Sequence, residues 1–134
     1  MHELTILRHL RRYKQFLGVF ASDELPKIKK RPSGLILNLD ESNKPGSHWC
    51  AVYFDGEGAA EYYDPLGFPP FCDRYLHENA PEGVIFNPHQ IQYVFSVSCG
   101  EFCIDFLERR FKGESFCEII SSYSKNSAFN DWLV

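Results

Sequence analysis

The sequence predicts an α+β protein with a small, mainly antiparallel sheet packed between helices. Apolar residues recur at helical spacing in 3–17 and again in 101–111, which is typical of amphipathic helices. Two short apolar runs flank the sequence Asp-Gly-Glu-Gly at 55–58, and this pattern favours a β-hairpin. Helical repeats grouped around a hairpin, without a regular alternation of strands and helices, predict the α+β class.

Length and composition indicate a single folded domain, residues 1–134. A chain of 134 residues has room for one hydrophobic core and not for two. Its apolar fraction of 44% and aromatic fraction of 16% exclude a disordered protein. A formal net charge of -4 argues against nucleic-acid binding over the whole surface. No apolar run approaches a membrane span and the N-terminus lacks a signal-peptide core, so we expect no membrane contact and no secretion.

The first expected element is the amphipathic helix at 3–17, which Gly18 ends. A basic sequence follows, with positive charges at Lys27, Lys29, Lys30 and Arg31. Such a run is typical of a solvated loop. A nuclear-import signal and an anion-binding patch are the alternatives.

The middle of the chain is expected to form the sheet. A buried strand at 35–39 and a polar turn at 40–46 precede the hairpin, whose strands at 47–54 and 59–63 pair antiparallel. A turn at 64–67 and a short helix at 71–79 come next. A last strand at 91–97 then leads into the helix at 101–111, and one or two short helices pack the apolar residues of 114–134.

Cys99 lies at the junction between that last strand and the central helix. Ser98 followed by Glu101 is a capping-box pattern, which makes Ser98 the N-cap and Cys99 the first helical residue. The positive end of the helix dipole favours the thiolate, the nucleophilic form of cysteine. Gly100 leaves room for a substrate backbone beside the sulfur. The alternative interpretation is a buried core cysteine.

A cysteine nucleophile needs a base and a group that orients the base. His48 begins one strand of the hairpin and Asp64 ends the other, so the turn brings them to the same end of the sheet. For the oxyanion, the Cys99 backbone amide is one donor, and the side chain of Gln92 or Gln90 is the second. Each residue also has a structural alternative: a half-buried histidine, a turn aspartate or an exposed strand glutamine.

The five cysteines predict free thiols and no metal site. Five is odd, so the chain cannot pair all of them in disulfides. No two are spaced as Cys-x-x-Cys, and a site drawing on His48 and Cys50 would need two distant ligands.

These motifs resemble the adenovirus protease (adenain) group of cysteine peptidases and, more distantly, the SUMO-deconjugating proteases. The similar segments are Phe16-Leu17-Gly18, Gly46-Ser47-His48-Trp49, the acid segment 63–68, Gln92, and the nucleophile segment 96–103. The order of histidine, acid, glutamine and cysteine differs from papain-type enzymes, which place the cysteine first. The acid is Asp64, as in SUMO-deconjugating enzymes, where many adenoviral members have Glu.

The resemblance implies a papain-like fold with altered chain order, with His48, Asp64 and Cys99 as the catalytic residues. It assigns the oxyanion hole to Gln92 and the Cys99 amide, and substrate contacts to Trp49 and Gly100. It implies a cysteine endopeptidase of a DNA virus or virus-like element that cleaves viral precursor proteins during virion maturation, next to small residues such as Gly-Gly or Gly-Ala.

Two alternatives stay open: a protease that removes a ubiquitin-like protein, and a catalytically silent protein-binding module of the same fold. The sequence itself requires no cofactor, whereas the resemblance implies activation by a viral peptide or by DNA. Contact with DNA would use Lys27, Lys29, Lys30 and Arg31. The expected location is the virion and the nucleus or cytoplasm of the host cell.

Overall fold

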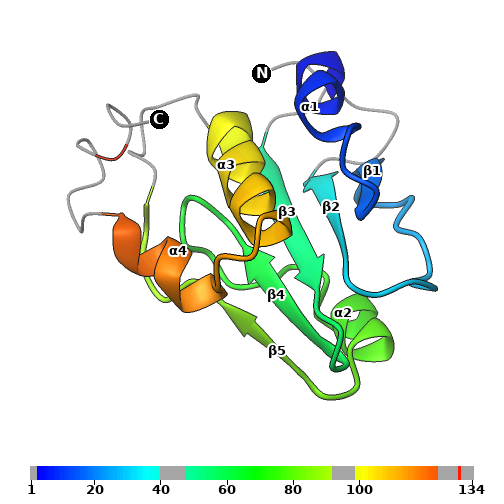
Figure 1. The fold of residues 1–134 in the computed structure, drawn as a ribbon. Coiled ribbons are helices and arrows are strands. Elements are labelled where there is room, and N and C mark those ends of the chain that lie inside the picture. The colour runs from blue at the N-terminus through cyan, green and yellow to red at the C-terminus, as the bar shows by residue number, and fades with distance from the viewer. Residues whose placement is uncertain (1–2, 40–47, 92–98, 124–129, 131–134) are drawn as a thin grey trace.

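The computed structural model describes residues 3–39, 48–91, 99–123 and 130. Four helices and five strands are assigned within these residues (Figure 1). In chain order they are α1 (Glu3–Leu10), β1 (Phe16–Ala21), β2 (Ser33–Asn38), β3 (Trp49–Phe54), β4 (Ala59–Tyr63), α2 (Asp73–Asn79), β5 (Gly83–Phe86), α3 (Cys99–Phe111) and α4 (Phe116–Ser122). The expected α+β class is therefore confirmed.

The five strands form one sheet in the order β1-β2-β3-β4-β5. The central pairs, β2 with β3 and β3 with β4, are antiparallel. The outer pairs, β1 with β2 and β4 with β5, are parallel. The sheet is thus mixed: antiparallel at its centre and parallel at both edges.

Helices cover both faces of the sheet. The first core cluster joins α1, α3 and α4 to one face, with Ile36, Ala51 and Tyr63 pointing into it. The second joins α2 to the other face through Leu76, and it contains Cys50 among the strand residues. Neighbouring residues of one strand enter opposite clusters, as the pleat of a strand requires.

α3 lies along β3 and is fixed to the sheet at its C-terminal end (Figure 1). The guanidinium of Arg110 forms a bidentate pair with the carboxylate of Glu61 in β4, with distances of 2.8 and 3.1 Å. The same guanidinium stacks on the ring of Tyr53 in β3, 4.1 Å from its centroid. An anchor at this end holds the helix axis, and with it the position of Cys99 at the other end.

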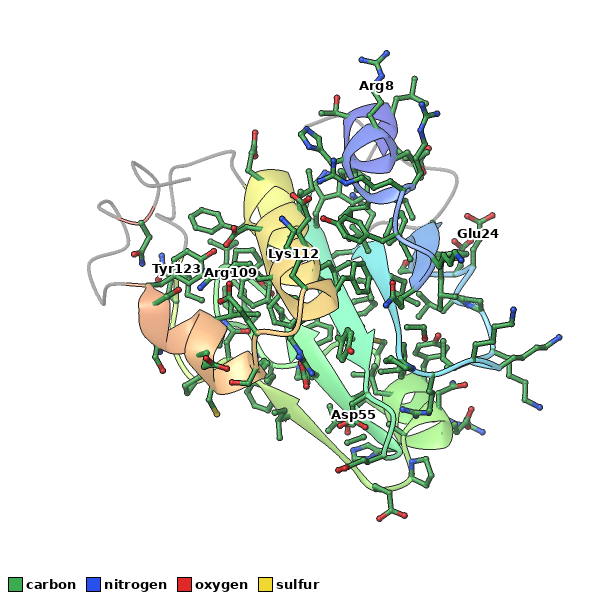
Figure 2. All side chains as sticks on the ribbon, viewed as in Figure 1. Arg8, Glu24, Asp55, Arg109, Lys112 and Tyr123 are labelled. Carbon is green, nitrogen blue, oxygen red and sulfur yellow. The ribbon has the colours of Figure 1, made fainter. Side chains whose placement is uncertain are left out.

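α4 packs beside α3 through its apolar face and a polar contact near its C-terminal end. Ser115 caps α4 by accepting a hydrogen bond from the Glu118 N–H at 3.1 Å, while the Glu118 carboxylate accepts from the Ser115 N–H in return. Figure 2 shows Arg109 of α3 beside Tyr123, whose hydroxyl donates to Asp105. Every helix in the described part of the chain is too short or too polar to cross a lipid bilayer.

The hairpin, the short helix that follows it and the central helix were predicted correctly. β4 occupies 59–63 as expected and pairs antiparallel with β3. The short helix predicted at 71–79 is α2, and the central helix begins at Cys99 as α3. Of the strand predicted at 91–97, Ile91 lies outside any strand and the other positions are outside the described residues.

The prediction for the N-terminal segment was wrong. The helix ends at Leu10, and Phe16–Ala21 is a strand, so Gly18 lies within β1 instead of ending a helix. The apolar run 16–21 pairs in parallel with β2, and this partner is distant in sequence, so the helical spacing of nearby apolar residues was misleading. The strand β5 was also missed: its strand-forming residues Val84, Ile85 and Phe86 make a short apolar run without the alternation that marks a half-buried strand.

Candidate active site

His48 and Asp64 lie side by side where β3 begins and β4 ends. The imidazole Nε2 is 2.8 Å from the Asp64 Oδ1. The side chain of His48 is 13% exposed and that of Asp64 is 2% exposed, so the pair is largely removed from water. The Leu39 N–H donates to the His48 carbonyl at 3.1 Å and thereby continues the β2–β3 ladder to the histidine. The hairpin thus produces the contact that its sequence predicts.

The carboxylate of Asp64 is held by its own turn. Its Oδ1 also accepts the Leu66 N–H at 2.8 Å, and the Gly67 N–H donates to the Asp64 carbonyl at 2.8 Å. An aspartate that accepts from the backbone two residues later forms an Asx-turn, which fixes the carboxylate against the strand end. The acid is therefore oriented before any partner approaches it.

Asn87 clamps the backbone of Asp64. Its Oδ1 accepts the Asp64 N–H at 3.0 Å, and its Nδ2 donates to the Asp64 carbonyl at 2.7 Å and to the His89 carbonyl at 3.0 Å. Asn87 follows the last residue of β5, and Asp64 follows the last residue of β4. Parallel neighbouring strands finish at the same end of the sheet, so the two side chains meet there. The side chain of Asn87 is buried.

The acid turn is also tied to residues 89–91. The Ile91 N–H donates to the Pro65 carbonyl at 2.8 Å. Gly67 has φ +78°, and a Cβ placed there would come within 2.8 Å of the Gln90 backbone nitrogen. Asn130 donates to the Ile91 carbonyl at 3.1 Å and so also holds the end of this segment. The chain is thus positioned up to the residue that precedes Gln92.

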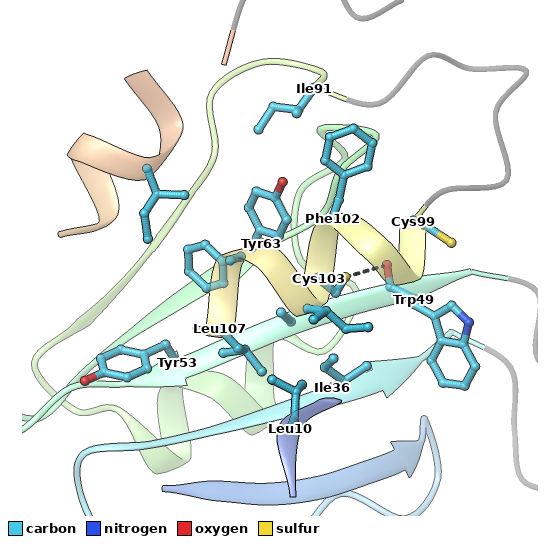
Figure 3. Close-up of a cluster of buried hydrophobic side chains, with 14 of the residues drawn as sticks. Leu10, Ile36, Trp49, Tyr53, Tyr63, Ile91, Cys99, Phe102, Cys103 and Leu107 are labelled. Carbon is cyan, nitrogen blue, oxygen red and sulfur yellow. Dashed lines mark hydrogen bonds between the residues drawn. The ribbon is translucent and has the colours of Figure 1, made fainter. Parts of the chain in front are cut away.

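Cys99 is the first residue of α3 and is 7% exposed. In Figure 3 its sulfur lies at the start of the helix, directed away from the apolar side chains and toward the same end of β3 as Trp49. One turn later, the Cys103 thiol donates to the Trp49 carbonyl at 3.3 Å and ties the helix start to β3. The Cys99 backbone N–H belongs to the first turn of the helix, where no carbonyl of the same helix can accept it.

Cys99 has the only lowered pKa among the cysteines of the described residues for which a shift is resolved. Burial by itself raises the Cys99 pKa, but a hydrogen bond from His48 and a backbone hydrogen bond from Trp49 outweigh burial, and the pKa falls below 9.0. Burial raises the pKa of Cys50 to about 11 and that of Cys72 to about 12. The pKa of the fully buried Cys103 is raised well above its ordinary value, again by burial.

The His48 imidazole is shifted in the opposite direction. Burial lowers its pKa, but hydrogen bonds to Asp64, Cys50 and Cys99 raise it to about 12. A raised histidine pKa next to a lowered cysteine pKa favours an imidazolium paired with a thiolate, because each charge stabilises the other. The arrangement therefore favours the thiolate form that a cysteine nucleophile requires.

The structure brings together His48, Asp64 and Cys99, the three residues predicted to act in catalysis. Trp49 lies beside them. Gly100 is buried in the first turn of α3, and its contact with substrate stays a prediction. The oxyanion glutamine Gln92 and the N-cap Ser98 lie outside the described residues, so both assignments also remain predictions.

Sequence reasoning missed Asn87. The dipeptide Asn87-Pro88 indicates a turn. No local pattern, however, says that the amide reaches a residue 23 positions earlier. That contact requires the parallel pairing of β4 with β5, and β5 is a run of only four residues that the sequence reasoning did not assign as a strand.

The basic run divides into two parts in the structure. Arg31 donates to the backbone carbonyls of Asp55 and Ala59, at 2.7 and 3.0 Å, and to that of Asn79. Its guanidinium therefore supports the hairpin turn and the end of α2. The remaining basic residues, Lys27, Lys29 and Lys30, are exposed.

Fold and site together define a chemical class. Nucleophilic catalysis by cysteine uses a thiol, an imidazole beside it and a carboxylate that orients the imidazole. All three groups are present here, with the thiol at a helix start and the carboxylate buried. Comparison with solved structures bears on the fold alone. No protein-family model and no curated protein sequence matches the chain.

The chain is similar to the crystal structure of the ASFV pS273R protease, with 19% sequence identity and a TM-score of 0.63. The similarity covers 97% of this chain and 62% of that one. The selenomethionine form of the same protease gives 20% identity and a TM-score of 0.57, over 98% of this chain and 52% of that one. At this identity the likeness establishes a shared fold, and membership of the adenain group remains a prediction.

Proposed function

We propose that this chain is a cysteine endopeptidase of a DNA virus or virus-like element. In this proposal it cleaves viral precursor proteins during virion maturation, next to small residues such as Gly-Gly or Gly-Ala. The single observation that carries the proposal is the contact of His48 with the buried Asp64 at 2.8 Å. The lowering of the Cys99 pKa by the same imidazole supports it. A protease fold supports the assignment, and the substrate class comes from the sequence resemblance.

The chemistry follows from the positions of the two ring nitrogens. Asp64 occupies Nε2, so Nδ1 is the nitrogen that exchanges a proton with the thiol. The Cys99 thiolate attacks the scissile carbonyl carbon, and the carbonyl oxygen becomes an oxyanion. The imidazolium then gives its proton to the leaving amine as the carbon–nitrogen bond breaks, which leaves a thioester on Cys99. Water, deprotonated by His48, hydrolyses the thioester and restores the thiolate.

Donors for the oxyanion are assigned by the same logic. The Cys99 amide is free of intrahelical partners at the first position of α3, and Gln92 is the proposed second donor. Residues 87–91 are fixed to the acid turn, so the segment that leads to Gln92 starts from a defined position. Trp49 and Gly100 are the proposed contacts of the substrate backbone.

A cleavage assay tests the proposal. Peptides from precursor-like sequences with Gly-Gly or Gly-Ala before the scissile bond should be hydrolysed by the wild-type chain and left intact by Cys99→Ala. Addition of a candidate viral peptide or of DNA in separate reactions tests the activators that the resemblance implies. If neither activator raises the rate, the requirement for a cofactor is removed and the protease assignment stands on the basal rate.

The assay also separates the rival functions. Cleavage of a ubiquitin-like fusion in preference to every precursor peptide would favour a deconjugating protease, for which the use of aspartate at position 64 is support. A folded wild-type chain that cleaves neither class, with and without activators, would favour a protein-binding module. The proposed location in the virion and the infected cell would be tested by detecting the protein in purified particles.

A further inference from the structure

His48, Cys50 and Asp64 form a cluster with the geometry of a metal site. One ligand atom from each residue lies within 4.8 Å of the other two. For any three atoms that lie within 4.8 Å of one another, there is a central point no more than about 2.8 Å from each atom. Zinc binds nitrogen, sulfur and oxygen ligands at about 2.0–2.3 Å. A movement of roughly 0.5 Å or somewhat more by each ligand therefore closes the cluster around an ion.

We propose that this cluster binds a thiophilic divalent cation of the Zn²⁺ type, and that the bound ion switches off the active site by occupying the His48 imidazole. The inhibitory consequence rests on the proposed protease function, whereas the binding itself does not. Histidine, cysteine and aspartate are all zinc ligands. A site with three protein ligands leaves a fourth position open for water or another donor.

The hairpin explains why these three residues meet. His48 and Cys50 are two residues apart, which places their side chains on one face of an extended chain. The register of β3 and β4 pairs Ala51 with Tyr63, so the next pair along the ladder is Cys50 with Asp64. A site based on His48 and Cys50 needs two further ligands. Asp64 supplies one of them, because it lies directly across the hairpin, so only one position remains for another donor.

The two anionic ligands already have hydrogen-bond donors behind them. The Tyr62 hydroxyl donates to the Cys50 sulfur at 3.4 Å, and the Leu66 N–H donates to Asp64 Oδ1 at 2.8 Å. Donors of this kind orient metal ligands in proteins and stabilise their charged forms. Tyr62 is 1% exposed, so its hydroxyl contributes a contact that water does not disturb.

Charge balance suits an ion in this buried position. One thiolate, one carboxylate and a neutral imidazole around Zn²⁺ have no net charge, which limits the cost of burial. On binding, the Cys50 thiol and the His48 imidazolium each lose a proton to solvent as the metal–sulfur and metal–nitrogen bonds form. His48 is the most exposed of the three side chains and is therefore the ligand nearest to solvent.

Cobalt titration of the Cys99→Ala chain tests the binding site. Co²⁺ replaces Zn²⁺ in tetrahedral sites and gives a near-ultraviolet absorption band when a thiolate binds it. We expect a saturable band at one ion per chain, displaced by Zn²⁺, that is lost in Cys99→Ala/Cys50→Ser and kept in Cys99→Ala/Cys117→Ser. Cys117 is the matched control because it is exposed and belongs to α4. His48→Ala, at a more exposed position, should weaken binding at least tenfold.

Three results would overturn the proposal. The band could be absent from Cys99→Ala while present in the wild type, which would place the ion on the proposed nucleophile. It could persist in folded Cys50→Ser, which would place the ion elsewhere. Finally, Zn²⁺ at concentrations that saturate the site could leave peptide hydrolysis by the wild type unchanged, which would remove the inhibitory role.

The binding readout needs no catalytic activity. A chain that binds cobalt through Cys50 but cleaves no peptide when metal-free would refute the proposed function and leave the metal site standing. A chain that cleaves peptides but gives no cobalt band in Cys99→Ala would do the reverse.

Discussion

At the scale of single residues, the site depends on the different pKa values that the fold gives to its cysteine thiols. Cys50 and Cys103 are fully buried, and burial raises the pKa of both. Cys99 is also largely buried, yet its pKa is lowered because His48 and the Trp49 backbone stabilise the thiolate. Contact with one imidazole and with the Trp49 backbone thus separates Cys99 from the cysteines whose pKa burial raises.

Alkylation should therefore select Cys99. In a Cys117→Ser background, which removes the exposed thiol, iodoacetamide at pH 6.5 should modify Cys99 before Cys50, Cys72 and Cys103. His48→Ala should slow the modification, by about tenfold for each unit by which the Cys99 pKa rises. Peptide mapping by mass spectrometry gives the order. Modification of Cys50 or Cys72 ahead of Cys99 in the folded chain would contradict the assignment.

Asn87 should act as a positioning residue. Asn87→Ala removes its hydrogen bonds to both backbone groups of Asp64, so the acid can shift relative to His48. We expect kcat for peptide hydrolysis to fall by up to about 10²-fold with KM little changed, as for a displacement of about 1 Å at a catalytic group. Steady-state kinetics on a cleaved peptide measure both constants.

Asn79→Ala is the matched control for this prediction. Asn79 also bridges two backbone groups, accepting the Ile28 N–H at 3.0 Å and donating to the Tyr75 carbonyl at 2.9 Å, but it does so at the end of α2. Its loss should lower the free energy of unfolding and leave kcat nearly unchanged. Equal effects of the two substitutions on kcat would mean that Asn87 contributes only general stability.

The residues of the site differ in how far the sequence could predict them. The pairing of His48 with Asp64 follows from a hairpin whose tight turn fixes which strand ends meet. The sequence predicts a lowered Cys99 pKa from the place of Cys99 at a helix start, whereas in the structure hydrogen bonds from His48 and the Trp49 backbone lower it. The clamp by Asn87 could not be predicted, because its partner is set by a parallel pairing between strands that are distant in sequence.

At the scale of elements, local signals succeeded where neighbours in sequence are neighbours in space. β3, β4 and α2 have their turn residues and apolar periods in one continuous stretch. β1 and β5 are edge strands that pair in parallel with partners reached through long connections, so their partners are invisible to a local pattern. The edges of the sheet were therefore the parts missed.

The turn at Gly67 is the element whose geometry the acid depends on. Alanine at this position would combine φ +78° with a Cβ only 2.8 Å from the Gln90 backbone nitrogen. Gly113 has φ +100° with open space around the corresponding Cβ, so Gly113→Ala tests backbone strain alone. We expect Gly113→Ala to cost about 1–2 kcal/mol of unfolding free energy.

Gly67→Ala should cost more than Gly113→Ala, by about 1–3 kcal/mol, the range for inserting atoms into a packed site. It should also lower kcat, because the acid turn must move away from residues 89–90. Urea unfolding and peptide hydrolysis measure the two effects. Equal stability of the two variants, with unchanged kcat, would show that the turn can move away from residues 89–90 at no cost to the site.

At the scale of the whole molecule, the proposed catalytic residues lie together at one end of the sheet. β3 begins there, β4 and β5 end there, and α3 begins above it. The C-terminal end of α3 is anchored by the pair of Arg110 with Glu61. This end of the helix holds it to the sheet, while the N-terminal end carries Cys99. The charges of the site then become linked to the folding of the domain, because both His48 and Cys99 have shifted pKa values.

The two shifts should have opposite effects on stability as pH changes. The His48 pKa is raised from 6.5 to about 12, so its stabilising contribution is complete below pH 6.5 and is lost as pH rises toward 12. The Cys99 pKa is lowered from 9.0, so its contribution is complete above pH 9 and is lost as pH falls. Between these limits an imidazolium–thiolate pair binds as many protons as an imidazole–thiol pair, so a native ion pair and the unfolded chain would carry the same number of protons at these two residues.

The wild-type free energy of unfolding should therefore change little with pH between about 7 and 8.5 as far as this pair is concerned. In Cys99→Ala only the histidine contribution remains, so stability should fall with rising pH, by at most about 1.4 kcal/mol per unit. Urea unfolding at several pH values measures both slopes, and Cys117→Ala, which removes an exposed thiol, should keep the wild-type slope. If Cys99→Ala and the wild type show the same slope, Cys99 is a neutral thiol in the native state, and the ion pair on which the proposed mechanism depends is absent from the free protein.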